Sequence, residues 1–579
     1  QTYTTGAINS SCTVTANFGQ ISYAVYATIG NGQGTVSPTS QVVNAGDTAQ
    51  FTISPDSGWE ILSVSGCNGS LNGQTYTTGA INSSCTVTAN FGQSVFTVTT
   101  NILSGQGTVT PTVQQVNAGS TTQFNIAPHP DWRIGSVNGC GGQLNGHIYT
   151  TASIQSNCQI EIEFIDRICR VTTFGVDSNT GSDWQNTATT LPSALSTDTC
   201  DEIWVSGYGP AYTPGSLRSD SFIINRDVKI YGGFYGTETS LNQRTLDPYL
   251  RNSILSGDID NDGSLSGNSY HVLQIDGQTA NNVVIDGFTI AYGNADGNNW
   301  PNNSGGGIFC DGANASTNAC SPTIQNVTFL NNNAIFGGGI YFDASYNGQS
   351  SANLSYLTFD SNTAESGGAI YINAQSNGVS YISIYNATFY NNLAMNNGAA
   401  MYVDASQDGL ANPNINHTTI YNNNAGNLGG GFYLDASLAG TSSLELKNSI
   451  LWGNASTDNK QIINIQNSHP IIQYSILEHS GAPLNWDSSL GTNLRNNHDI
   501  NPGLRDFDYH GGFTKNMLIG NNGPALDGGL YEPGNMIDQR YSQRPIDGND
   551  DGLVLVDIGS VETSQVEADI IFKDGFDIE

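Results

Sequence analysis

The sequence predicts an all-β protein, in which tandem small disulfide-pinned β-domains precede a right-handed parallel β-helix with a C-terminal capping module. Three observations support this fold class. Only 11% of the 579 residues are charged, while 68 are glycine, a composition typical of turn-rich β-structure. The first part of the chain repeats every 73 residues, and a later part repeats about every 30 residues.

The 73-residue repeat comprises two modules, residues 21–93 and 94–166. The segment GQGTVSPTSQVVNAGDTAQFTISP (32–55) corresponds to GQGTVTPTVQQVNAGSTTQFNIAP (105–128). Runs such as TAQFTIS and CTVTANF alternate apolar and polar residues, which indicates half-buried strands. Each module is therefore expected to be a small β-domain. Residues 1–20 repeat residues 74–93 without a change, so we expect them to be the last part of a partial module.

The cysteines predict four disulfides. A pair separated by 18 residues recurs at the same place in both modules, and no second CxxC or HxxxH lies nearby to form a metal site. The predicted disulfides are Cys67–Cys85, Cys140–Cys158, Cys169–Cys200 and Cys310–Cys320. They predict an oxidising, extracellular compartment.

Cys12 has no such partner within the chain. We therefore expect one of two arrangements. Either the parent protein continues N-terminally through further modules, or residues 1–20 complete a module of another chain by strand addition.

The 30-residue repeat predicts the β-helix. Units begin at 329, 359, 389, 420 and 450, and each is too small to bury its own apolar face, so the units must stack. The stack is expected to contain two internal columns. One is apolar, with Phe329, Phe359, Phe389 and Ile420; the other is a ladder of hydrogen-bonded amides, with Asn332, Asn362, Asn392 and Asn423.

Several patterns resemble known bacterial families. The G-x-G-T-V-x-P and N-A-G-x-T-x-x-F patterns of residues 1–166 resemble extracellular repeat domains related to the internalin B-repeat. FxxN followed by GG-[AG]-I resembles polymorphic outer-membrane-protein-type β-helix repeats, and IDQRYSQRPIDGNDDGLVLVDIGSVE resembles a choice-of-anchor C-terminal module. These resemblances imply a secreted or cell-surface bacterial protein.

The expected domains follow from these repeats and resemblances. They are a partial module (1–20), two β-repeat modules (21–93 and 94–166), the N-terminal cap and first coils of the β-helix (167–280), the β-helix (281–500), an anchor-like cap (501–562) and a tail (563–579).

The repeats also align a set of carboxylates: Asp343, Asp404 and Asp435, with Asn373 on the remaining unit. Neighbouring coils of a β-helix lie roughly 4.8 Å apart, so two of these carboxylates could serve as the acid and base of a glycan hydrolase. The alternative is that Asp-Ala-Ser is an ordinary turn repeated for architecture. A lyase is disfavoured because no Lys or Arg occurs between Arg251 and Lys447.

Two acidic clusters are candidate calcium sites, with a solvated turn as the alternative at each. The first has EF-hand-like spacing, although its twelfth position is Ser269 rather than glutamate. The candidate ligands are Asp258, Asp260 and Asp262 in DIDNDGS, and Asp547, Asn549, Asp550 and Asp551 in DGNDDG.

The functional prediction is an extracellular structural or adhesive surface protein. It would be a stalk or filament subunit that presents or assembles β-helix heads, with head-to-tail self-association. The alternative is a carbohydrate-binding or glycan-hydrolysing β-helix that uses Asp343, Asp404 and Asp435, with Tyr341, Tyr371 and Tyr402 as exposed aromatics. The net charge of −33 disfavours nucleic acid and anionic membranes as partners. The sequence favours a non-catalytic protein but leaves enzymatic activity open.

Overall fold

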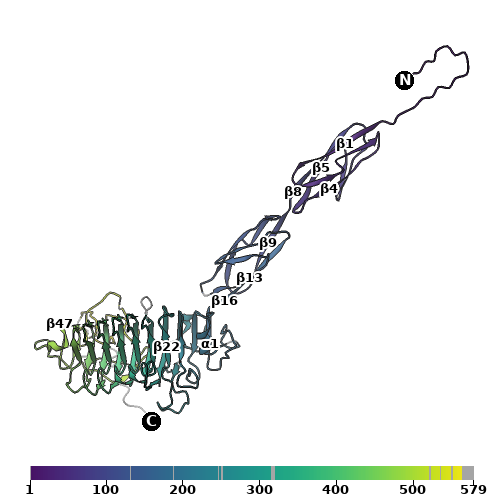
Figure 1. Cartoon of the computed structure of the whole chain (residues 1–579). Coiled ribbons are helices and arrows are strands. Elements are labelled where there is room, and N and C mark those ends of the chain that lie inside the picture. Colours follow the sequence, from purple (N-terminus) through teal and green to yellow (C-terminus); the bar gives the residue numbers. More distant parts are fainter. Residues whose placement is uncertain are drawn as a thin grey trace, which may run out of the picture. The chain divides into compact units, whose positions relative to one another are not determined.

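The structure is a computed structural model that describes residues 2–130, 132–186, 188–245, 247–249, 252–314, 320–520, 523–534, 536–548 and 552–563. The chain contains two compact units, residues 1–166 and 167–579. Strands make up almost all of the regular structure in both units (Figure 1), and the predicted all-β fold class is confirmed.

The first unit contains two modules of the same architecture. The first module has β1 (Ser22–Asn31), β2 (Gly34–Ser37), β3 (Ser40–Asn44), β4 (Gln50–Pro55), β5 (Trp59–Ser65), β6 (Ser70–Asn72), β7 (Thr75–Thr77) and β8 (Cys85–Gln93). The second has β9 (Val95–Ser104), β10 (Gly107–Thr110), β11 (Val113–Asn117), β12 (Gln123–Pro128), β13 (Trp132–Asn138), β14 (Gln143–Asn145), β15 (Ile148–Thr150) and β16 (Cys158–Asp166). Each module has two four-stranded sheets, ordered β3-β1-β8-β5 and β2-β4-β7-β6 in the first.

The core of each module depends on a phenylalanine from its last strand. Phe91 is buried beside Phe51 and Val87. A Cβ atom at Gly34 would lie 2.4 Å from the Phe91 ring, so the second glycine of the GQGTV segment allows the ring to approach the backbone. A disulfide between Cys67 and Cys85 joins the loop that follows β5 to the start of β8. The second module has the equivalent disulfide, Cys140–Cys158.

Residues 2–20 form no strand, although the same sequence at 74–93 forms β7 and β8. The difference lies in the partners. Strand β7 pairs with β4 and β6, and β8 pairs with β1 and β5, whereas none of the described residues pairs with residues 2–20. Phe18 is consequently 95% exposed, while its counterpart Phe91 is 1% exposed.

The second unit is a parallel β-helix built from four sheets. Sheet A contains β17 (Ile168–Val171), β18 (Glu202–Ser206), β20 (Val228–Phe234), β21 (Ser253–Ser256), β23 (Val283–Ala291), β26 (Thr323–Leu330), β30 (Asn353–Asp360), β34 (Ser383–Tyr390), β38 (Asn414–Tyr421), β42 (Glu445–Lys447), β43 (Ile450–Trp452), β45 (Ile471–Gln473), β46 (Ile476–Leu477) and β47 (Thr492–Arg495). Sheet B contains β19 (Phe222–Ile224), β22 (Leu273–Asp276), β25 (Ile308–Asp311), β28 (Ile340–Asp343), β32 (Ile370–Asn373), β36 (Met401–Asp404), β40 (Phe432–Ala436) and β44 (Ile462–Gln466).

Two shorter sheets complete the coils. Sheet C contains β24 (Asn294–Ala295), β27 (Asn333–Phe336), β31 (Thr363–Ser366), β35 (Leu393–Ala394) and β39 (Asn424–Ala425). Sheet D contains β29 (Gln349–Ser350), β33 (Val379–Ser380), β37 (Leu410–Ala411) and β41 (Thr441–Ser442). Two 3-10 turns, η1 (Leu241–Gln243) and η2 (Ser488–Leu490), and the helix α1 (Leu191–Ser196) lie outside the sheets.

The interior of the coils contains the two columns that the repeat spacing indicates. Rings of Phe329, Phe359 and Phe389 stack with centroids 4.7 and 4.6 Å apart. Beside them, each ladder asparagine donates from its side-chain amide to the side-chain oxygen of the next. The donor–acceptor distances are 3.0 Å for Asn332 to Asn362, 3.0 Å for Asn362 to Asn392, 2.8 Å for Asn392 to Asn423 and 2.8 Å for Asn423 to Asn454.

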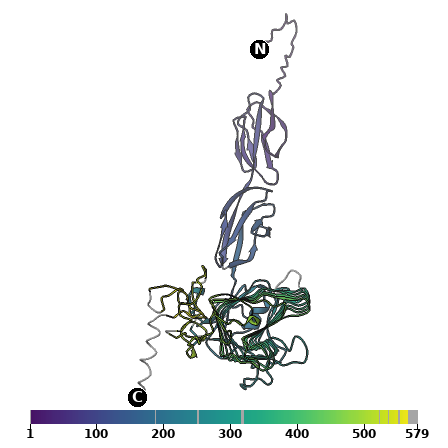
Figure 2. The same cartoon turned by 90° about the vertical axis from the view of Figure 1, so that its left-hand side faces the viewer.

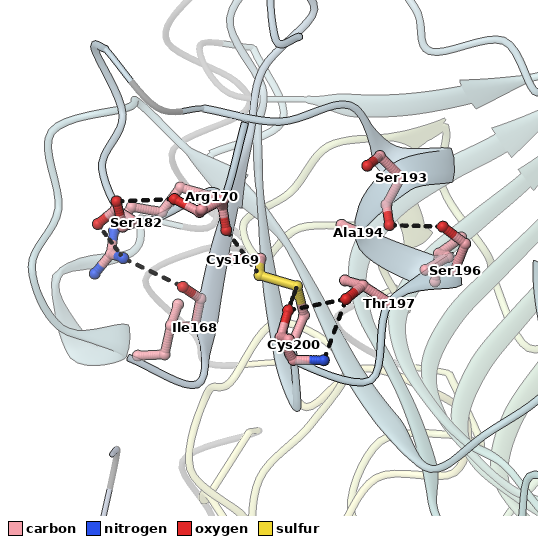
Figure 3. The surroundings of a disulfide bond; sticks show 12 residues. Ile168, Cys169, Arg170, Ser182, Ser193, Ala194, Ser196, Thr197 and Cys200 are labelled. Carbon is pink, nitrogen blue, oxygen red and sulfur yellow. Dashed lines mark hydrogen bonds between the residues drawn. A yellow bond between two sulfur atoms is a disulfide. The ribbon is translucent and has the colours of Figure 1, made fainter. Parts of the chain in front are cut away.

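The N-terminal end of the β-helix core is covered by α1. Leu191, Ala194 and Leu195 are buried in the main core, and Thr190 caps the helix by accepting from the Ser193 amide. The disulfide Cys169–Cys200 ties the segment after α1 to β17 (Figure 3). A further disulfide, Cys310–Cys320, closes the loop after β25.

The C-terminal end of the core is covered by η2 and the residues before it. Leu490 is buried in the main core and Trp486 packs against it. Asn464 on β44 donates to the Ser489 carbonyl at 2.6 Å, which fixes this segment over the last strand of sheet B. The chain therefore closes both ends of its own apolar interior.

The described residues of the segment 501–563 run along the outer face of sheet A, beside the coils (Figure 2). This module contains β48 (Phe507–Asp508) and β49 (Asn516–Met517). Successive strands of sheet A each hydrogen-bond to it, through Asn326 on β26, Leu357 on β30, Thr388 on β34, Thr419 on β38 and Lys447 on β42. The module thus links several coils that are neighbours in the stack.

Candidate functional site

Two columns of side chains run along the outer face of sheet B, because equivalent residues of successive strands are paired in register. The aromatic column contains Phe309, Tyr341, Tyr371, Tyr402 and Tyr433. The acidic column contains Asp276, Asp311, Asp343, Asn373, Asp404 and Asp435. Strand alternation places these residues outside, while their neighbours, such as Ile340 and Phe342, enter the main core.

The aromatic column is a continuous stack of rings. Neighbouring centroids lie 5.7 Å apart from Phe309 to Tyr341, 5.4 Å from Tyr341 to Tyr371, and 4.8 Å at each of the next two steps, which end at Tyr433. Phe336 packs edge-on against Tyr371. Tyr341 and Tyr371 are buried, and only Tyr402 and Tyr433 are partly open to solvent. The predicted exposed aromatics therefore face outward but are largely covered.

Asp404 acts as a turn acceptor. Its Oδ1 accepts from the Ser406 amide at 3.1 Å and from the Ser406 hydroxyl at 2.7 Å. Its Oδ2 accepts from the Tyr371 hydroxyl at 3.1 Å and from the Gln375 side-chain amide. With four donors and 5% exposure, this carboxylate has little capacity left for a substrate.

The same turn recurs on the neighbouring coils. Asp343 accepts from the Ser345 amide at 2.9 Å, Asn373 from the Gln375 amide at 3.2 Å, and Asp435 from the Ser437 amide at 2.9 Å. Each is an Asx turn that directs the chain away from sheet B. Because Asn373 makes the turn as well as the aspartates do, the turn requires an acceptor oxygen and not a charge.

Burial changes the ionisation of this column. It raises the pKa of Asp343 and of Asp311 above the ordinary value for aspartate. The pKa of Tyr371 is also raised well above its usual value, first by burial and then by the neighbouring Asp404. Raised carboxyl pKa values occur at catalytic sites as well, so accessibility decides the interpretation. Asp343 is 2% exposed and cannot meet a polysaccharide without rearrangement.

Repeat spacing did not identify Asp276 and Asp311 as members of the column. Their strands end in QID and FCD, without the Ala-Ser that follows the aspartate on later coils, and Asp276 precedes the regular 30-residue units. The signal that could have found them is an aspartate that directly follows a short apolar strand, as in LQID and IFCD.

Of the two predicted calcium clusters, the first is compact. One oxygen from each of Asp258, Asp260 and Asp262 lies within 4.8 Å of the others. Asp258 is buried, and its two oxygens accept from the Asp262 amide at 3.2 Å and the Gly263 amide at 3.1 Å. This arrangement suits either a turn or a cation bound by oxygen ligands. Calcium binding by this first cluster stays a prediction.

The second predicted cluster is described only in part. Asp547 accepts from the Gly552 amide at 3.0 Å. Asn549, Asp550 and Asp551 lie outside the described residues. The structure therefore places one of the predicted ligands.

A family comparison matches the chain at one place. Residues 356–373 match the Chlamydia polymorphic membrane protein repeat. This segment includes Phe359 and Asn362 of the internal columns and Tyr371 and Asn373 of the outer ones. The match thus covers part of one coil of the β-helix, and the matched repeat is one found in bacterial surface proteins.

No curated protein and no solved structure matches the chain. No helix in the part of the chain that the structure describes is long and apolar enough to cross a membrane.

Proposed function

We propose that the chain is an extracellular structural or adhesive surface protein, in which the tandem modules form a spacer and the β-helix is the presented body. One observation carries the proposal: the aligned carboxylates of the β-helix serve as turn acceptors, as the four donors on Asp404 illustrate. The repeated surface is therefore a rigid scaffold for display.

The disulfides support an extracellular role. Cys67–Cys85, Cys140–Cys158, Cys169–Cys200 and Cys310–Cys320 need an oxidising environment to persist. The match to a polymorphic membrane protein repeat supports a bacterial surface location. Small modules that each have their own core suit a spacer, since every module folds around its own phenylalanine and disulfide.

Self-association is a further part of the proposal. Because α1 and η2 cover the two ends of the core, head-to-tail assembly would use the surfaces of these covering segments and not exposed apolar interior. Light scattering and electron microscopy of the purified chain, with and without calcium, test this part. Ordered fibres support assembly, and a monomer under both conditions removes it from the proposal.

The adhesive role is tested by displaying three chains on a bacterium that does not attach to host cells: the full chain, residues 1–166 and residues 167–579. The two units have separate cores, so each can be displayed alone. We expect attachment with the full chain and with residues 167–579, and none with residues 1–166. Equal attachment by all three, or by none, contradicts the proposal.

A carbohydrate-cleaving role has less support, because Asp343 and Asp404 are almost completely buried. Asp435 is more accessible and accepts a hydrogen bond from the Ser437 amide. A glycosidase needs two carboxyl groups that both reach the scissile bond.

A further inference from the structure

A cavity of about 370 Å³ opens near the N-terminal end of the β-helix, outside the columns of sheet B. Three neighbouring parallel strands of sheet A, β17, β18 and β20, lead to it. An aromatic residue follows each strand: Phe174 after β17, Tyr208 after β18 and Tyr235 after β20. Since parallel strands end at the same edge of a sheet, the three side chains gather at one mouth.

These aromatic side chains are unusually open to solvent. Phe174 is 77% exposed, Tyr208 is 66% exposed and Tyr235 is 53% exposed. The rings of Tyr208 and Tyr235 have centroids 6.1 Å apart and are tilted by 55°, so they are not stacked flat on each other. A group of exposed aromatic residues around a concavity indicates an interaction site.

The cavity wall is held in place by partly buried hydrogen bonds. The Trp184 indole N–H donates to the Glu238 carbonyl at 2.8 Å. The Glu238 carboxylate accepts from the backbone amides of Tyr235 and Gly236 at 2.8 and 2.9 Å. Trp184 also packs against Phe234, with centroids 5.6 Å apart. One buried glutamate therefore fixes both an indole and a tyrosine of the lining, which reduces the ordering cost of binding.

The loop that carries Trp184 is anchored at its other side. The Arg170 guanidinium donates to the Ser182 carbonyl at 2.9 Å, and Arg170 follows the disulfide-bonded Cys169 (Figure 3). The Asn179 amide donates to the Ala188 carbonyl at 3.0 Å, which closes the same loop. The disulfide and these hydrogen bonds give the cavity a preformed wall.

The polar lining of the cavity is uncharged. Amides come from Asn179, Gln185 and Asn186, and hydroxyls come from Thr172 and Ser206. None of the described lining residues is Asp, Glu, Lys or Arg. An anionic ligand would need cationic partners, and a purely apolar ligand would leave the amides unpaired.

A second cavity of about 190 Å³ lies next to the first and shares Thr172 with it. Its lining, which includes Tyr212, Phe222 and Pro210, is also uncharged among the described residues. Two adjoining uncharged cavities suit a ligand longer than a single ring.

We infer that this pair of cavities binds a short neutral oligosaccharide. The aromatic faces carry negative quadrupole charge that attracts the C–H groups of a sugar ring, while the amides and hydroxyls hydrogen-bond its hydroxyl groups. The inference adds a ligand class to the adhesive role proposed above and rests on that role for its biological use. The binding itself does not depend on attachment to cells.

The test measures binding of cellohexaose, maltohexaose and chitohexaose to the full chain, by saturation-transfer NMR and calorimetric titration, with an oligogalacturonate of the same length for comparison. We expect saturable binding of at least one neutral oligosaccharide. Tyr208→Ala and Tyr235→Ala should each weaken it at least tenfold, which is about 1.4 kcal/mol. Gln185→Ala, another exposed lining residue, should weaken it as well.

Tyr381→Ala is the matched control, since Tyr381 is 47% exposed and does not line either cavity. It should bind as the wild type does. The inference is overturned if no neutral oligosaccharide binds, if the tyrosine variants bind unchanged, or if the uronate binds better. Sugar binding without cell attachment would instead contradict the adhesive role alone, and attachment without sugar binding would contradict only the cavity.

Discussion

At the residue scale, the β-helix repeats one polar residue on each side of its wall, an asparagine inside and an aspartate outside. The two have different structural roles. The internal asparagines are each buried and bond both to the next asparagine and to backbone. Asn392, for example, donates to the Phe359 carbonyl at 2.9 Å and to Asn423 at 2.8 Å. The external aspartates accept hydrogen bonds in turns, and on one coil Asn373 takes the place of the aspartate.

Asn392→Ala should destabilise the β-helix by about 3 kcal/mol, because it removes the side-chain oxygen that accepts from the buried Asn362 backbone amide and the side-chain donor to the Phe359 carbonyl and to Asn423. Urea unfolding of the second unit, followed by circular dichroism, measures the loss. Asn353→Ala is the control, since Asn353 is exposed on β30, and it should change stability by less than about 0.5 kcal/mol. Equal effects would contradict a structural ladder.

Asp404→Asn should cost less than about 1 kcal/mol, because an asparagine oxygen can still accept from the Ser406 amide, as Asn373 does from Gln375. Asp404→Ala should cost about 2 kcal/mol, because it removes the acceptor. The same unfolding measurement compares the two variants. An asparagine as damaging as alanine would show that the position needs both carboxylate oxygens and not only the acceptor of the turn.

At this scale, the 30-residue repeat spacing predicted the internal columns of the β-helix. It identified the internal asparagines from Asn332 to Asn423, which repeat with the coil. It could not show that Tyr341 and Tyr371 are covered, because Phe336 and the neighbouring rings reach them from other strands. It also did not extend the ladder to Asn454, whose unit has a degenerate sequence.

At the scale of elements, the position of the C-terminal module is a feature that the sequence left open. Its resemblance to an anchor-like cap did not specify where it packs. In the structure it is attached along sheet A, where Gln539 donates to the Leu357 carbonyl at 3.0 Å and accepts from Thr388 at 2.7 Å. Such contacts join residues more than 150 positions apart and leave no local pattern in the sequence.

The attachment includes a buried ionic cluster. The guanidinium of Arg544 contacts the Glu562 carboxylate at 3.3 Å and the His417 imidazole at 2.6 Å. Arg540 pairs with Asp538 at 3.0 Å. Burial and Arg544 together lower the pKa of His417 well below its ordinary value, so the imidazole is neutral and accepts the hydrogen bond.

Two carboxyls of this cluster hold protons more strongly than usual. Burial raises the pKa of Glu562 from 4.5 to about 7, and burial together with the neighbouring Glu562 raises the pKa of Asp557 well above its ordinary value. The folded state therefore binds protons that the unfolded chain releases. This contribution to stability is complete below about pH 4.5 and is lost as the pH rises through about 7.

The free energy of unfolding of wild type should thus fall, relative to that of Glu562→Gln, between about pH 4.5 and 7. Glutamine cannot titrate, so the difference between the two proteins reports the Glu562 carboxyl together with its effect on the neighbouring Asp557. Unfolding by urea at pH 5, 6, 7 and 8 measures it. A difference that stays constant, or that changes in the opposite direction, would contradict the raised pKa of Glu562.

The calcium prediction also belongs to a single element, the loop that follows β21. If the loop binds calcium, 1 mM calcium should raise the thermal midpoint of the second unit, since a ligand that binds only the folded state stabilises it. Asp260→Asn should abolish the shift, because Asp260 lies in the cluster. Asp408→Asn, outside the cluster, should retain it. An unchanged midpoint in wild type, or an equal shift in both variants, argues for a simple turn.

At the scale of the whole molecule, the sequence predicted the two architectures because both are repetitive. A period of 73 residues is long enough for a module with its own core, and a period of about 30 is not. The identical segments 1–20 and 74–93 show the limit of this reasoning. The sequence alone does not determine the strands, since β8 forms only where β1 and β5 pair with it.

We propose a surface protein that displays its β-helix and binds a ligand, and whose repeated aspartates build turns. The most direct measurement is the release of new reducing ends or unsaturated products from neutral and acidic glycans, comparing wild type with Asp404→Asn in the same preparation used for attachment. We predict no product from either protein and equal attachment by both. Product release by wild type that Asp404→Asn abolishes would contradict the account and make the acidic column of sheet B a catalytic site.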